Sequence, residues 1–332
     1  MRRAIFILSL ILITAGVGLA RSVVLIEKRQ SIGVSYPIED TKVVKLADGS
    51  VAQLVTCCGL NQDDSATFTV RDGDGYTLVD HKFSNGRFFL SPEGRVVAIQ
   101  KIGPSFTVTF HDSRLKVIKQ LNLVNVNTLA AGDRGSIAVL LRQGSSMLLR
   151  VFDSGGESRW EVKDLHGGNL YFLPGEAQLA VTDGKLLSLY SYGSDKPRVL
   201  DAKAAVQYVG IDPGQNRLFL AVAAEAGPEI WAINPATLEP VWKQTLGQIA
   251  AGHCQNMMVE FSRYVSSQNI VALLLRCSGD RNSFYVARFL NTDGQVIGQE
   301  KLGRRIDAGF YEVKNNLAIV SDGFTYTFSI RD

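Results

Sequence analysis

A short apolar segment that recurs seven times constrains the fold of this sequence more than any other feature. Each segment has four to six residues, and the first residues of successive segments are 39 to 52 residues apart. Aliphatic and β-branched runs of this length are typical of strands buried on both faces. The segments are Val51–Thr56, Val96–Ile99, Ile137–Leu141, Leu179–Thr182, Leu218–Val222, Ile270–Leu275 and Leu317–Val320.

A second strand with a more alternating pattern follows every apolar segment. Most of these second strands end in Asp or Asn and lead into a Gly-containing turn such as Asp72–Gly75 or Asp153–Gly156, which supplies the positive φ that short hairpins need. A third strand follows in several repeats, for example at Arg159–Val162 and Pro240–Lys243. The second strands are Thr67–Asp72, Phe106–Asp112, Leu148–Asp153, Leu187–Tyr192, Glu229–Asn234, Phe284–Asn291 and Phe324–Ile330.

Four short strands per unit of about 40 residues is the spacing of β-propeller blades. No amphipathic helix alternates with the strands, which argues against an α/β fold. The sequence therefore predicts an all-β chain with a single β-propeller of seven four-stranded blades. Six or eight blades stay open as alternatives, because the longest spacing could hide a further unit.

The ends of the chain predict how the propeller closes. The last repeat reaches Asp332 directly after Phe324–Ile330, which is the third of its four strands when the strand before the apolar segment is counted. It therefore lacks a fourth strand, and Ser22–Gln30 is a strand without a repeat of its own. Pairing these two segments would complete the seventh blade and remove exposed sheet edges.

Two repeats carry a more particular pattern, in which a turn at Asp or Asn is followed by a Trp on the outer strand. They are Val151–Trp160 and Trp231–Gly247. This pattern resembles the repeat of pyrroloquinoline-quinone-like propellers and, more loosely, of WD-like propellers. The resemblance implies a propeller that is often exported, and it implies little about chemistry. For the Trp side chains themselves we expect packing between blades with the ring N–H satisfied.

The N-terminal twenty residues have the pattern of a signal peptide. Arg2 and Arg3 precede an apolar run from Ala4 to Val17, and small residues at Gly18 and Ala20 predict cleavage between Ala20 and Arg21. The predicted domains are thus a signal peptide at 1–20 and a propeller at 21–332. An uncleaved membrane anchor is the alternative. The absence of Asn-x-Ser/Thr sequons favours a bacterial protein, periplasmic or secreted.

Four cysteines in an exported chain indicate disulfides. Cys254 and Cys277 flank a strand–turn–strand that brings them nearly opposite one another, which predicts a structural cross-strand disulfide. Cys57 and Cys58 remain as the second pair, either as a strained vicinal disulfide or as two thiols that cap a strand. A redox or metal site is the alternative, although no second pair of zinc-like spacing accompanies it. A vicinal cysteine ring also occurs in some quinone-dependent dehydrogenases, but the calcium-binding carboxylate and catalytic Asp of those enzymes have no match in this sequence.

The other candidate ligands do not form a motif. His81, His111, His166 and His253 lie in different repeats or connecting loops, and no zinc-binding spacing accompanies them. The remaining candidates, Asp63, Asp64, Asp72 and Asp74, lack the spacing of an EF-hand, and turn chemistry explains the Asp72 segment better. We predict no metal, no cofactor and no catalytic residue.

Composition and motifs together favour a binding role. The formal net charge is +3, and Arg2 and Arg3 supply two of those charges, so no basic stripe suggests nucleic acid. We therefore expect an exported, monomeric, non-catalytic module that binds a protein, peptide or glycan, with a membrane link only if the N-terminal segment is retained. The alternative is a propeller enzyme (a lactonase, a lyase or a quinone-type oxidoreductase) with a metal or cofactor in the central channel.

Overall fold

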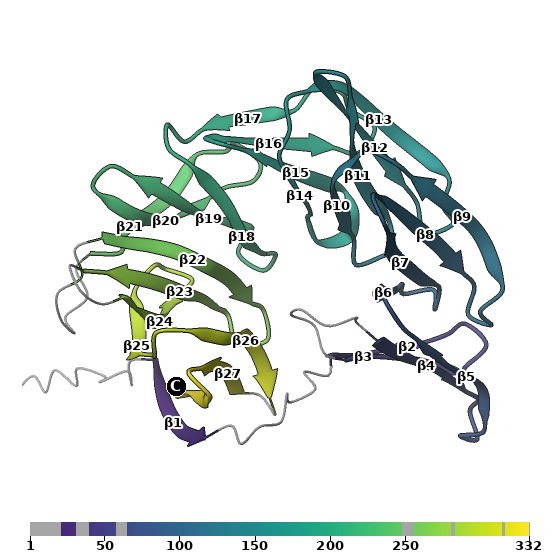
Figure 1. Cartoon of the computed structure of the whole chain (residues 1–332), viewed down its shortest axis with the longest axis horizontal. Helices are drawn as coiled ribbons and strands as arrows, with labels where there is room; N and C mark the ends of the chain where they lie inside the picture. The colour runs from purple at the N-terminus through teal and green to yellow at the C-terminus, as the bar shows by residue number, and fades with distance from the viewer. Residues whose placement is uncertain are drawn as a thin grey trace, which may run out of the picture.

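Each apolar segment forms the second strand of a four-stranded antiparallel sheet in the computed structural model, which describes residues 21–30, 40–57, 65–247, 254, 256–279, 283–313 and 316–331. Within these ranges the chain makes seven such sheets, arranged as blades around a central opening (Figure 1). This is a seven-bladed β-propeller, as the repeat predicts. We number the blades 1 to 7 in chain order.

In blades 1 to 6 the strand order from the centre outward follows the chain. Blade 1 contains β2 (Asp40–Lys45), β3 (Val51–Cys57), β4 (Ser65–Arg71) and β5 (Thr77–Phe83). Blade 2 contains β6 (Arg87–Leu90), β7 (Val96–Ile102), β8 (Ser105–His111) and β9 (Val117–Leu123). Blade 3 contains β10 (Val126–Ala131), β11 (Ile137–Gln143), β12 (Ser146–Phe152) and β13 (Ser158–Leu165).

The later blades repeat this arrangement, and one short 3₁₀ turn, η1 (Pro174–Glu176), is added in blade 4. Blade 4 contains β14 (Asn169–Phe172), β15 (Gln178–Asp183), β16 (Leu186–Ser191) and β17 (Arg198–Asp201). Blade 5 contains β18 (Val206–Asp212), β19 (Arg217–Ala224), β20 (Gly227–Ile233) and β21 (Pro240–Thr245). Blade 6 contains β22 (Asn256–Val265), β23 (Ile270–Ser278), β24 (Ser283–Asn291) and β25 (Val296–Lys301).

Blade 7 joins the two ends of the chain. It contains β26 (Ile306–Val313), β27 (Asn316–Ser321), β28 (Phe324–Arg331) and, as its outer strand, β1 (Ser22–Gln30). Strand β1 pairs antiparallel with β28 from Ser22 opposite Arg331 to Gln30 opposite Phe324. The predicted closure by the N-terminal strand is therefore present.

The packing between blades explains why the apolar segments, which lie second from the centre in each blade, are apolar at every position. In β23, Ile270, Ala272 and Leu274 pack toward blade 7, whereas the alternate residues Val271 and Leu273 pack toward blade 5. All five are at most 3% exposed. A strand that lies between two neighbouring blades has no solvent face, so it needs apolar side chains at every position.

Side chains at the outer hairpins fix the turns between third and fourth strands. Asp72, Asp112, Asp153 and Asn291 each use one side-chain oxygen to accept the backbone N–H groups of the second and fourth following residues, at 2.8–3.0 Å. These bonds replace the pairing that the backbone loses at the turn. The side chain of Asp72 thus has the turn role that its sequence context indicates.

Candidate functional site

The innermost strands β2, β6, β10, β14, β18, β22 and β26 surround the central opening, and each of them pairs with a neighbour on one side only (Figure 1). Exposed side chains on these strands therefore lie along the inner edges of the blades. The chain begins each inner strand at the same end of the channel, so the first residues of the seven strands meet there. We call this end the channel mouth.

One polar residue of each inner strand occupies an equivalent position in the pairing of that strand with the apolar strand of its own blade. In four blades this residue pairs directly with the third residue after the first residue of the apolar run. In the other three blades it lies in a β-bulge, between two residues that pair with the third to fifth residues after that first residue. All are exposed except Gln207, which is partly buried. We call this set the channel ring; its members, from blade 1 to blade 7, are Lys42, Arg87, Asn127, Asn169, Gln207, Glu260 and Asp307.

The channel ring is ordered by charge. Blades 1 and 2 contribute cations, blades 3 to 5 contribute amides, and blades 6 and 7 contribute carboxylates. Two members are engaged elsewhere. The Lys42 ammonium donates at 3.0 Å to the backbone oxygen of Asp133, which lies in the β10–β11 turn, so this side chain is directed away from the mouth. The Asp307 carboxylate accepts a bond from the Arg305 guanidinium at 2.6 Å. Within the described residues, the side chains of the other five members make no hydrogen bond or ion pair.

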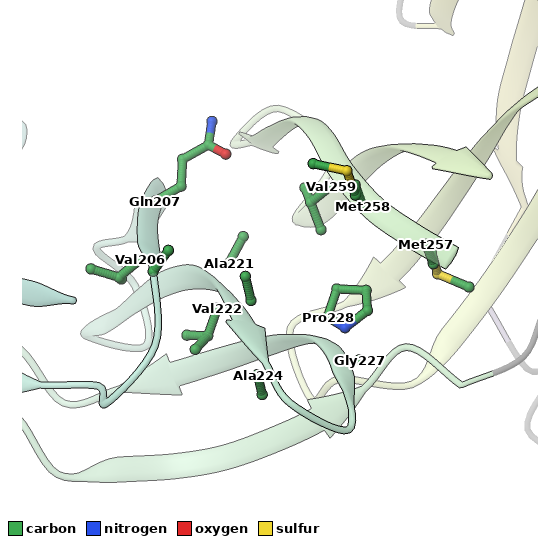
Figure 2. Close-up of a pocket in the computed structure, with 12 residues that line it drawn as sticks. Val206, Gln207, Ala221, Val222, Ala224, Gly227, Pro228, Met257, Met258 and Val259 are labelled. Carbon is green, nitrogen blue, oxygen red and sulfur yellow. The ribbon is translucent and has the colours of Figure 1, made fainter. Parts of the chain in front are cut away.

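An apolar pocket of about 260 Å³ opens beside the ring, between blades 5 and 6 (Figure 2). The beginning of β18 and the hairpin from β19 to β20 form one wall, and the beginning of β22 forms the other. Gln207 belongs to both the ring and the pocket, and Met258 at the rim is 62% exposed. The lining residues are Ala205, Val206, Gln207, Ala221, Val222, Ala223, Ala224, Gly227, Pro228, Met257, Met258 and Val259.

A disulfide beside one pocket wall and hydrogen bonds to the other wall stabilise the pocket. The sulfur atoms of Cys254 and Cys277 form a disulfide with Cα atoms 5.3 Å apart, which is the pair that the sequence indicates, and Cys277 is directly opposite the pocket residue Met257. On the other wall, the backbone N–H of Leu246 donates to Pro228 at 2.9 Å, and the buried Arg288 guanidinium donates to the backbone oxygen of Leu246. Burial lowers the pKa of Arg288.

The structure does not bring the other sequence candidates together. His81 packs edge-on against Phe83, with ring centroids 4.6 Å apart, and His111 Nδ1 lies 3.3 Å from the backbone oxygen of Leu115. His166 is exposed between β13 and β14. Across the described residues, no three His, Cys, Asp or Glu side chains are grouped to hold a metal.

Several candidates fall outside what the structure describes. Cys57 ends β3, but its side chain is not described, and Cys58, Asp63, Asp64 and His253 lie outside the described residues. Of the two residues that flank the predicted cleavage site, Ala20 also lies outside the described residues. Arg21 is described, and its guanidinium donates to the backbone oxygen of Gln268 at 2.7 Å. In the described part of the chain, no helix has the length and apolar character needed to cross a membrane.

The tryptophans confirm one expectation and correct another. Trp160 is 7% exposed and contacts the rings of Tyr190 and Tyr192 in the next blade, as expected for packing between blades. The ring N–H of Trp242 donates to the backbone oxygen of Thr292 at 3.0 Å. The ring N–H of Trp160, in contrast, is buried without a partner among the described residues, so the expected satisfaction of every ring N–H is wrong there.

Comparisons with known proteins support the fold. The chain matches no protein-family model and no curated protein sequence. The structure is similar to the Dos1 propeller, with a TM-score of 0.53 and 11% identity over 92% of this chain and 95% of that one. It is also similar to Hsv2 of Kluyveromyces lactis (TM-score 0.54, 12% identity, 89% of this chain and 97% of that one). A prolyl endopeptidase structure aligns with a TM-score of 0.54 and 10% identity over 89% of this chain and 50% of that one. At such low identities these likenesses indicate the β-propeller fold alone.

The channel ring is not among the residues predicted from the sequence, although the sequence contains a signal for it. Every ring member stands 9 to 11 residues before the first residue of its apolar run, as Arg87 does before Val96 and Glu260 before Ile270. That spacing equals one short inner strand plus one tight turn. The pocket has no comparable signal, because its walls come from two blades.

Proposed function

We propose that this protein is a non-catalytic binding module whose ligand is a peptide segment of a partner protein, bound at the channel mouth. The observation that carries the proposal is the apolar pocket beside a ring of polar side chains. Ligand sites commonly combine an apolar cavity with a few polar groups that orient the ligand.

The size and lining of the pocket favour a side chain over a cofactor or a sugar. Sites that enclose a drug-sized molecule usually measure roughly 300–1,000 Å³, and this pocket measures about 260 Å³. Its lining contains no aromatic ring on which a sugar could stack. Met257 and Met258 supply flexible, polarisable side chains that adapt to apolar groups of different shape.

The proposal includes export of the protein and removal of residues 1–20. The signal-peptide pattern around Ala20 and the disulfide between Cys254 and Cys277 support this, because disulfides persist in oxidising compartments. Trp160 and Trp242 on the outer strands, packed toward the next blade, support a relationship to the pyrroloquinoline-quinone-like propellers.

A binding assay tests the proposed function. Fluorescein-labelled hexapeptide libraries, N-acetylated and C-amidated with one position fixed at a time, are titrated with the purified protein and followed by fluorescence polarisation. We expect one position to select an apolar residue. Burying such a side chain contributes about 1.5–3 kcal/mol, so its replacement by Ala should weaken binding roughly 10- to 150-fold.

A pair of protein variants locates the site. Met258→Glu places a carboxylate at the pocket rim and should weaken binding at least about tenfold, because the ligand would desolvate that charge. Val241→Glu is the matched control: Val241 is 50% exposed on the outer strand of blade 5, away from the pocket. The absence of any selected position, or equal binding by both variants, would refute the proposed function.

A further inference from the structure

The ring member Arg87 has features that the pocket alone does not explain. It is the first residue of β6, it is exposed, and no described residue pairs with its guanidinium. Lys42 on the neighbouring blade has the same charge sign, but its ammonium is bound to the backbone of Asp133. A guanidinium presents a planar fork of donors that matches a carboxylate in a bidentate manner. Arg87 is thus the free cation of the ring in the described part of the chain.

The three amides connect the pocket to Arg87. Gln207 lines the pocket on blade 5, and Asn169 and Asn127 follow on blades 4 and 3, directly before blade 2 (Figure 1). Each amide offers two N–H donors and an acceptor oxygen, and none is used by the described residues. A row of unused amides is suited to the alternating N–H and C=O groups of an extended peptide backbone.

The carboxylate beside the pocket sets the direction of such a peptide. Glu260 follows the pocket residues Met258 and Val259 on β22, and no described residue neutralises it. An acidic ligand group next to the pocket would be repelled by Glu260, whereas the same group at the far end of the amide row would meet Arg87. The charge order of the ring therefore separates the two ends of one ligand.

We propose that the ligand is an extended peptide with an apolar side chain in the pocket between blades 5 and 6, its backbone along Gln207, Asn169 and Asn127, and an acidic side chain on Arg87. This inference rests on the proposed function and adds the chemical character of the partner segment, which is an apolar anchor and an acidic residue several positions apart.

The test uses the best apolar-anchored hexapeptide from the fixed-position libraries, lengthened by two residues on either side. Asp and Asn are compared at every position other than the anchor. We expect one position to prefer Asp over Asn by about two- to fivefold, as expected for an exposed ion pair, with the preference shrinking as salt is raised. The Arg87→Glu variant should lose this preference and favour Lys at the same position.

Arg71→Glu is the matched control, because Arg71 is an exposed arginine at the end of β4 and the substitution changes the net charge equally. It should retain the Asp preference. If the peptide binds and Met258→Glu weakens it, but no position prefers Asp or the preference survives Arg87→Glu, the acidic-segment inference is overturned while the proposed function stands. If no peptide binds the wild-type protein, both are overturned.

Discussion

Opening the disulfide between Cys254 and Cys277 should destabilise the protein by an amount that follows from the chain length it encloses. The two cysteines are 23 residues apart. In the chain-entropy description of a disulfide, a closed loop of this size stabilises the folded state by about 3.4 kcal/mol, because the unfolded chain loses conformational freedom. Either single substitution, Cys254→Ala or Cys277→Ala, opens the same bond. We therefore expect each single variant and the double variant to lose about the same free energy of unfolding.

Urea denaturation followed by tryptophan fluorescence measures this loss. Ser278→Ala is the control, since Ser278 adjoins Cys277 at the end of β23 and its substitution leaves the bond intact; its effect should stay within about 0.5 kcal/mol. A loss below about 1 kcal/mol in the single variants would refute the entropic reasoning. A double variant that loses the sum of the two single losses would refute the disulfide itself, because two residues of one bond are not independent.

Two further substitutions test the packing of a buried ring and the ionisation of a partly buried one. Phe289→Ala removes a fully buried ring whose centroid lies 4.8 Å from that of Phe328 and 5.8 Å from that of Phe310. Urea denaturation should show a loss of about 3–5 kcal/mol in the free energy of unfolding. Phe261→Ala is the control, because this side chain is 38% exposed and its loss should be much smaller; equal losses would contradict the packing. Burial, and then the nearby Asp212 carboxylate, raise the pKa of Tyr264 to about 12 from about 10. The native state therefore holds this phenolic proton more tightly, and the resulting stability is fully present below about pH 10 and is lost as the pH rises through about 12. In Tyr264→Phe the free energy of unfolding should fall less steeply between pH 10 and 12 than in the wild-type protein, and identical slopes would contradict the pKa shift.

The blade count and the closure could be predicted because they depend on local patterns. A strand buried between two blades needs apolar residues at every position. This requirement produces a continuous apolar run, such as Ile270–Leu275, that can be recognised in the sequence. The turns are equally local, since the side chain of Asp112 bonds to backbone groups only two and four residues later. Such features repeat in every blade and reinforce one another.

The candidate site could not be predicted in the same way. Its parts come from different blades, so Arg87 and Gln207 are 120 residues apart in the sequence, and no local rule relates them. The pocket forms where β22 passes β18 and the β19–β20 hairpin, which depends on how blades 5 and 6 pack. The disulfide is intermediate between these cases. Its two cysteines are close in sequence because they flank one hairpin, so their positions relative to the turn are enough to predict the bond.

The closure in blade 7 also has a consequence in time. Strand β1 is among the first described residues to be synthesised, and its partner β28 is almost the last, about 300 residues later. At roughly 5–20 residues per second, synthesis of the intervening chain takes about 15–60 s. Within that interval the chain supplies every strand of blades 1 to 6 before it supplies the first strand pair of blade 7. Strand β1 therefore stays without its partner until β28 has been synthesised, and a chain that stops before Phe324 leaves β1 unpaired.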